Sequence, residues 1–285
     1  MARVFLADPT PHTLSPSPPF PYPARMETIV SADGTQIAFE KTGNGPPLVL
    51  VHGGVSDHTR WTPVLDGLSR SFTVFAMDRR GRGGSGDGPD YSLAREFEDV
   101  AALVRHCGPG TRLIGHSFGA LCSLEAALLV DNLSHLVLYE PPFSPVGRAD
   151  VDPAFVARLQ TLLDKGERDR LLADFYREIV HLDDAALDKL RASPAWPGRV
   201  KAAHTIVREM SFADYVYDPA RFAALTLPTL LLAGGDSQPG MTAAIFRLAE
   251  DLPNNRLEVM PGQNHIAMDT APEMFTDLVT GFLLG

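Results

Sequence analysis

The sequence predicts an α/β fold, in which a mostly parallel sheet carries helices on both faces. Short apolar runs alternate with amphipathic stretches along most of the chain. Runs such as 48–51, which reads Leu-Val-Leu-Val, are uninterrupted and typical of strands buried on both sides. The alternation stops over residues 144–224, where only helical patterns occur. We therefore expect a helical lid, inserted after the sixth strand and placed over the carboxyl ends of the strands.

Composition narrows the classes of partner. The chain has 285 residues, with 35 acidic and 25 basic side chains and a net charge of −10. An acidic chain is poorly suited to nucleic acid or to an anionic membrane surface. No apolar run reaches the roughly 18–20 residues that cross a bilayer. We expect a small-molecule substrate, no nucleic acid and no membrane partner, and we leave a homodimer open.

The cysteines and the N-terminal composition bear on the compartment. Cys107 and Cys122 are too few for a disulfide framework, and no zinc-site spacing occurs. The first residues lack the basic and apolar regions of a signal peptide. We expect a reducing, cytoplasmic setting, no metal and no cofactor.

The first elements follow a proline-rich segment. Seven prolines lie between positions 9 and 23, so residues 1–25 are expected to form an N-terminal arm without helix or central strand. Asp33-Gly34 predicts a hairpin turn between two short strands. The elements expected up to residue 130 are strands at 27–31, 36–40, 48–51 and 73–77, helices at 58–70 and around 93–104, and a strand–helix unit around 115–119.

The second half contains the lid and the last strands. The expected elements are a strand at 135–139, lid helices around 153–164, 167–181, 183–192 and 199–213, strands at 228–233 and 256–260, and helices at 240–251 and 271–283. This order divides the chain into the arm, a core made of residues 26–143 and 225–285, and a helical cap of residues 144–224.

A Gly-x-Ser-x-Gly pentapeptide is the strongest chemical signal. Residues 115–119 read Gly-His-Ser-Phe-Gly and stand directly between a strand pattern and a helix pattern. So tight a turn holds Ser117 in a strained backbone conformation that exposes its hydroxyl, as a nucleophile requires. A Cβ at either glycine would collide with the neighbouring strand or helix.

A serine hydroxyl needs a base to remove its proton. His265 is the candidate, because it follows the last strand in a Pro-Gly loop and precedes the final helix. His116 is expected to pack or to line the pocket, and His52 to hold the loop after the third strand through a hydrogen bond.

In four features the chain resembles the α/β-hydrolase superfamily, over roughly residues 26–285. These are His52-Gly53-Gly54, the Asp78–Ser85 turn, the 115–119 pentapeptide and a histidine after the last strand, in that order. The resemblance implies a lidded serine hydrolase fold and a structural role for the Asp78–Ser85 turn. An oxyanion intermediate needs two donors, and we expect them to be the N–H groups of Phe118 and Gly54.

Two carboxylates compete for the third catalytic position. The superfamily usually places the acid in a Gly-x-x-Asp pattern after the seventh strand, but here Ser237 occupies that place and Asp236 stands one residue early. Glu140 ends the sixth strand, where some lactone hydrolases and haloalkane dehalogenases carry their acid. We prefer Glu140 and keep Asp236 as the alternative.

These residues predict a serine hydrolase that cleaves an ester, lactone or related carbonyl bond of a small apolar substrate through an acyl-enzyme. The same three residues also serve carbon–carbon bond hydrolases, perhydrolases and lyases, so that reaction type stays an alternative. A non-catalytic ligand receptor on the same fold is a third possibility.

Overall fold

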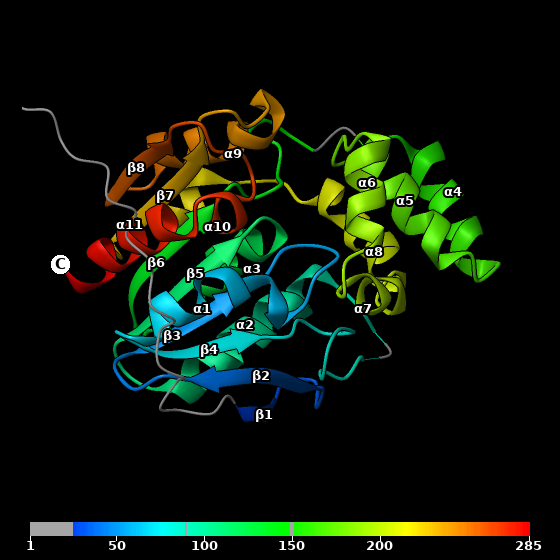
Figure 1. Cartoon of the computed structure of the whole chain (residues 1–285). Coiled ribbons are helices and arrows are strands. Elements are labelled where there is room, and N and C mark those ends of the chain that lie inside the picture. Colours follow the sequence, from blue (N-terminus) through cyan, green and yellow to red (C-terminus); the bar gives the residue numbers. More distant parts are fainter. Residues whose placement is uncertain (1–24, 89, 149–150) are drawn as a thin grey trace, which may run out of the picture.

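The computed structural model describes residues 25–88, 90–148 and 151–285. The predicted arm lies outside this range except for Arg25, which begins the first strand. Eight strands form one sheet in the order β1-β2-β4-β3-β5-β6-β7-β8 (Figure 1). Their bounds are β1 Arg25–Val30, β2 Gln36–Thr42, β3 Pro47–Val51, β4 Thr73–Met77, β5 Thr111–His116, β6 Leu133–Tyr139, β7 Thr229–Gly234 and β8 Asn255–Met260.

The sheet is parallel from β4 to β8 and antiparallel only at one end. Strand β1 pairs with β2, and β2 pairs with β4, in antiparallel fashion. The remaining pairs are parallel, with β3 between β4 and β5, and β6 between β5 and β7. The prediction of a mostly parallel sheet is confirmed. Because parallel strands share a direction, the ends of β3, β5, β6, β7 and β8 meet at one edge.

Helices cover both faces of the sheet. One apolar cluster joins the strands to α2 (Leu93–Cys107), α3 (Phe118–Ala126) and α9 (Pro239–Asp251). A second cluster joins the opposite face to α1 (Thr62–Ser69), α10 (Ala267–Thr270) and α11 (Pro272–Leu284). Within the described part of the chain, no helix is long and apolar enough to cross a bilayer.

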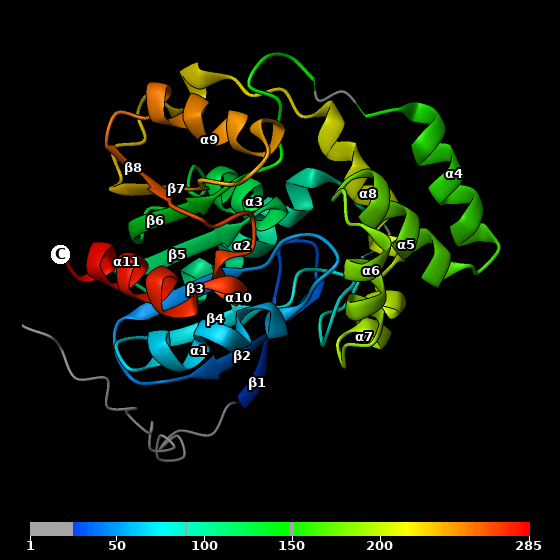
Figure 2. The same cartoon turned by 45° about the horizontal axis from the view of Figure 1, so that its top comes forward.

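The segment between β6 and β7 is helical and stands at one end of the sheet (Figures 1 and 2). It has its own apolar core, which includes Phe155, Leu159 and Trp196. Its elements are α4 Pro153–Asp164, α5 Arg168–Glu178, α6 Asp184–Arg191, α7 Trp196–Lys201, α8 His204–Glu209 and the 3₁₀ turns η2 Met210–Asp214 and η3 Pro219–Phe222.

Two predicted helices are broken in the structure. The helix expected at 199–213 is divided into α7, α8 and η2, and the Thr205 hydroxyl donates to the Ala202 carbonyl at 2.7 Å at the break. Such a side-chain bond competes with the helical ladder. The helix expected at 58–70 begins as the 3₁₀ turn η1 (His58–Trp61) and becomes α1 at Thr62, where Pro63 favours the start of a helix.

We expect Gly119→Ala to destabilise the fold strongly. A Cβ at position 119 would lie 2.3 Å from the Val51 carbonyl oxygen and 2.5 Å from that of His52, and neither backbone atom can easily move. The expected loss is about 1–3 kcal/mol or more in the free energy of unfolding, measured by urea titration. The control is Gly281→Ala, which meets nothing within 4 Å and should be neutral or stabilising by up to about 1 kcal/mol. Equal stability of the two variants would contradict this reading.

Candidate active site

Ser117 directly follows strand β5 and lies in a strained turn. The residue has φ 54° and ψ −125°, outside the regions that side chains ordinarily allow. Its N–H donates to the Tyr139 carbonyl at 2.8 Å, which ties the turn to the end of β6. A Cβ at Gly115 would lie 2.5 Å from the Gly119 carbonyl oxygen, so the steric reason predicted for these glycines is confirmed.

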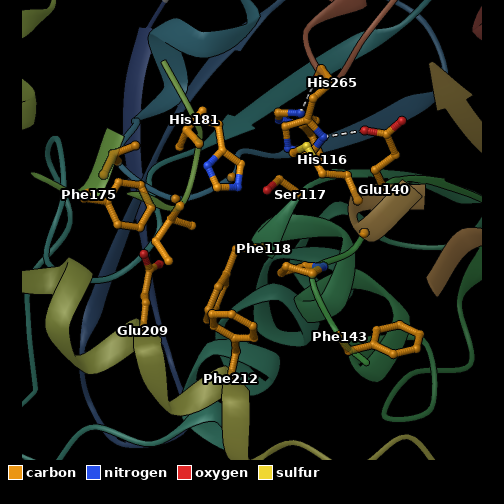
Figure 3. Close-up of a pocket in the computed structure, with 18 of the residues that line it drawn as sticks. His116, Ser117, Phe118, Glu140, Phe143, Phe175, His181, Glu209, Phe212 and His265 are labelled. Carbon is orange, nitrogen blue, oxygen red and sulfur yellow. Dashed lines mark hydrogen bonds and ion pairs between the residues drawn. The ribbon is translucent and has the colours of Figure 1, made fainter. Parts of the chain in front are cut away.

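Glu140 also has a left-handed backbone, with φ 44°, directly after β6. Its side chain is almost fully buried, at 1% exposure. One carboxylate oxygen, Oε1, accepts the Gly234 N–H at 2.7 Å. The other, Oε2, lies 2.5 Å from Nδ1 of His265. Figure 3 shows Ser117, His265 and Glu140 together along one side of a cavity.

Asp236 lies elsewhere. Its side chain is exposed and does not border the cavity. Its backbone N–H donates to the Gln263 carbonyl at 2.8 Å, and that of Gly235 donates to Met260 at 2.8 Å. These bonds fix the loop after β7 against the loop that carries His265. The structure therefore brings Glu140, and not Asp236, into contact with His265.

The loop of His265 is held by His116 and Tyr139. His116 lines the cavity, as predicted, whereas the part of Tyr139 was not predicted. The Tyr139 hydroxyl donates to the carbonyl of Asn264. Nε2 of His116 donates to the His265 carbonyl at 2.8 Å, and the two imidazole rings lie 4.6 Å apart. Burial, together with the nearby charges of His265 and Arg60, holds the pKa of His116 well below its usual range. His116 is therefore a neutral donor that holds the backbone of the His265 loop.

The loop after β3 presents the N–H of Gly54. The Gly53 carbonyl accepts hydrogen bonds from Nδ1 of His52 at 2.7 Å and from Nη1 of Arg79 at 3.1 Å. In a trans peptide the C=O and the following N–H point in opposite directions. These two bonds therefore turn the Gly54 N–H the other way, and Gly54 itself borders the cavity. His52 makes the hydrogen bond predicted for it.

His52 has a single consistent tautomer. Its Nδ1 must donate to Gly53, and its Nε2 accepts the Arg79 N–H at 3.1 Å. Burial and the charges of Arg79 and Arg82 lower its pKa well below the usual range, so the ring is neutral. Within the described residues, the N–H groups of Gly54 and Phe118 have no protein acceptor. Phe118 is the first residue of α3, and the positive end of the helix dipole there would further stabilise an anion bound to its N–H.

A buried network of four charges joins this loop to the lid. Arg79 pairs with Glu96 of α2 at 2.9 Å and with Glu209 of α8, and Glu209 also pairs with Arg82. Burial alone would raise the pKa of Glu209, but Arg82 and Arg79 outweigh it and lower that pKa. Glu209 therefore stays ionised and fixes the lid to the arginine that orients Gly53.

The cavity has a volume of about 620 Å³ and lies between the sheet edge and the lid. Phe118, Phe175, Met210 and Phe212 are among its apolar lining residues. Four non-glycine residues of the described chain have a positive φ, and all four line this cavity. They are Val55, Ser117, Glu140 and His181. Backbone strain of this kind gathers where a site needs a fixed geometry.

One group of side chains in the described residues has a metal-ligand arrangement. Asp57, His58 and Asp78 offer ligand atoms within 4.8 Å of one another. The hydrogen bond from His58 to Asp78, at 2.7 Å, is the largest influence on His58 and raises its pKa. Asp78 also accepts the backbone N–H groups of His58 and Gly84, both at 2.8 Å. Its carboxylate is therefore already engaged in holding this turn.

Removal of the Glu209 carboxylate should destabilise the protein far more than removal of an exposed one. Glu209→Ala leaves two buried arginines short of a partner, so we expect a loss of about 3–5 kcal/mol on urea unfolding. The control is Glu178→Ala in the same lid, because Glu178 is 49% exposed and, among the described residues, pairs only with Arg158. Its loss should stay below about 1 kcal/mol.

The Glu209 contribution should also depend on pH. Its pKa is lowered in the folded state from 4.5, so the stabilisation is complete above about pH 4.5 and declines as the pH falls. Wild type and Glu209→Ala should therefore converge in stability in acid. A difference that is constant between pH 7 and pH 3 would contradict this assignment.

Known proteins share this fold. A model of the alpha/beta hydrolase family matches residues 48–278. The chain is 28% identical over 256 residues to 2-(acetamidomethylene)succinate hydrolase of Mesorhizobium japonicum, covering 85% of this chain and 89% of that protein. It is 26% identical over 252 residues to the pimeloyl-[acyl-carrier protein] methyl ester esterase of Nitrosomonas europaea, covering 84% and 96%.

A solved structure gives the same result. The crystal structure of an alpha/beta hydrolase from Sphaerobacter thermophilus has a TM-score of 0.80 and 36% identity, and covers 90% of this chain and 99% of its own. The chain belongs to the alpha/beta hydrolase family and is an enzyme of the hydrolase type.

Proposed function

We propose that this hydrolase cleaves an ester, lactone or related carbonyl bond of a small molecule through an acyl-enzyme on Ser117. The contact of 2.5 Å between Glu140 and Nδ1 of His265 carries the proposal. Because Nδ1 faces the carboxylate, Nε2 is the nitrogen left to exchange a proton with the serine and the leaving group. Asp236 has no such contact, and we assign it no catalytic role.

In the first half of the reaction, Oγ of Ser117 attacks the substrate carbonyl while Nε2 of His265 takes the hydroxyl proton. The carbonyl oxygen becomes an anion between the N–H groups of Phe118 and Gly54. Glu140 stabilises the imidazolium that forms. The tetrahedral intermediate then collapses, and His265 gives its proton to the leaving group.

In the second half, water attacks the acyl-enzyme, and His265 removes a proton from it. The same two N–H groups hold the second oxyanion, and collapse releases the acid and restores Ser117. The oxyanion donors need no rearrangement, because His52 and Arg79 already hold the Gly53 peptide. The aromatic and aliphatic lining supports a substrate whose body is largely apolar.

The relatives support hydrolysis as the reaction class but do not identify one substrate. One is named for hydrolysis of a methyl ester and the other for hydrolysis of a substituted succinate. We therefore keep the bond type at an ester, lactone or related carbonyl.

Ser117→Ala should abolish turnover. The variant lacks the nucleophile but keeps the fold, so kcat/KM for a chromogenic short-chain ester should fall on the order of 10⁴-fold or more. The control is Ser193→Ala, because Ser193 lies in the lid away from the cavity. Wild-type rates from Ser117→Ala would refute the mechanism.

Glu140→Gln and Asp236→Asn form a matched pair that tests the acid. Each exchange removes a negative charge and keeps the side-chain size. We expect kcat to fall by about 10³–10⁴-fold in Glu140→Gln, because the imidazolium loses its counter-charge, and to change less than about threefold in Asp236→Asn. The reverse ranking would assign the acid to Asp236.

A further inference from the structure

The cavity contains two arginines that the proposed chemistry does not use. Arg60 lies in η1, beside the core, and Arg199 lies in α7 of the lid. Both border the cavity, together with Tyr176. Neither position drew attention in the sequence, because a lone arginine in a helical pattern is ordinarily a solvated surface residue.

The guanidinium of Arg60 is only partly satisfied. Its Nη1 donates to Asp269 at 2.6 Å. Its Nε and Nη2 are buried and have no hydrogen-bond partner in the described residues. The side chain is only 12% exposed. Buried donors without acceptors are costly. These two nitrogens carry three unused N–H groups in a side chain that borders the cavity, which indicates an acceptor that belongs to the ligand.

Unlike Arg60, which is paired with Asp269, Arg199 has no carboxylate partner within the described residues. It donates to the Tyr176 hydroxyl. All three side chains border the cavity. Burial raises the pKa of Tyr176, and the charges of Arg199 and Arg60 act in the opposite direction.

The carboxylates that border the cavity are already engaged. Glu140 is bound to His265 and to the Gly234 N–H. Glu209 is bound to Arg79 and Arg82. Neither is available to Arg199, whereas Arg60 is already paired with Asp269. Within the described residues, the Arg199 guanidinium is therefore an uncompensated positive charge in a largely apolar lining.

We propose that Arg60 and Arg199, with Tyr176, form a subsite for a carboxylate carried by the substrate apart from the bond that is cleaved. A carboxylate offers two acceptor oxygens to the forked donors of arginine, and in this setting it would satisfy Nε and Nη2 of Arg60. The substrate is then an acidic acyl compound with an apolar body, in contrast to the small apolar substrate expected from the sequence. This proposal rests on the proposed function, since it names the substrate class of the same site.

The test compares two esters that differ in one charge. The mono-p-nitrophenyl ester of glutaric acid carries a free carboxylate, and its methyl ester is the neutral counterpart. Wild type should have a kcat/KM at least about tenfold higher for the acid. Arg60→Gln and Arg199→Gln should each reduce the ratio of the two kcat/KM values about 10-fold or more, mainly through KM. The ratio cancels any change that affects both esters equally.

Two control variants accompany Arg60→Gln and Arg199→Gln. Arg158→Gln removes an exposed lid arginine that pairs with Glu178 outside the cavity, and its ratio should equal that of wild type. Arg60→Lys keeps a charge beside Asp269 and should retain part of the preference, which separates loss of the carboxylate contact from loss of folding.

The outcomes also separate the two proposals. Hydrolysis of both esters at equal kcat/KM, with ratios unchanged in the arginine variants, would overturn the carboxylate subsite and leave the serine mechanism standing. If neither ester is cleaved, the proposed function fails for these esters, and binding of glutarate decides the subsite. Glutarate should raise the melting temperature of wild type and Ser117→Ala but not of Arg199→Gln, and the absence of any shift would overturn the subsite.

Discussion

The contact between Glu140 and His265 is the interaction on which the site depends. It joins residues 125 positions apart and exists only because two neighbouring strands end in strained turns. The N–H of Ser117 is bound to Tyr139, and Glu140 is the next residue along the chain, so Ser117 and Glu140 are fixed to the same strand end. Regular backbone would direct both side chains differently, and the parallel sheet supplies the rigid support that keeps these conformations populated.

A network of buried charges also joins the lid to the edge of the sheet that carries Ser117. Glu209 reaches from α8 to Arg79, and Arg79 in turn binds the Gly53 carbonyl. Arg79 therefore links the orientation of the Gly54 N–H to the position of the lid. Isolated buried ion pairs contribute little net stability. We therefore regard this network chiefly as a device that sets geometry.

Local patterns were sufficient to predict the parallel core and the turn at Ser117, because strand burial, glycine sterics and helix periodicity act over a few residues. The choice between Glu140 and Asp236 stayed open, since it depends on the positive φ at Glu140 and on backbone bonds between the loops after β7 and β8. The positions of Arg60 and Arg199 at the cavity were missed for the same reason, because they follow from packing between distant segments. The break at Thr205 is instead a local effect of its bond to Ala202, which a helical pattern of apolar residues does not show.

The central claim is that Ser117 is an activated nucleophile, and labelling with a serine-directed organophosphate tests it most directly. Wild-type protein would be treated with diethyl p-nitrophenyl phosphate, and the modified residue located by peptide mapping and mass spectrometry. The account predicts a single phosphoryl group on Ser117, with ester hydrolysis lost in proportion to labelling. Modification of a different residue, or full hydrolysis after Ser117 is completely labelled, would contradict it.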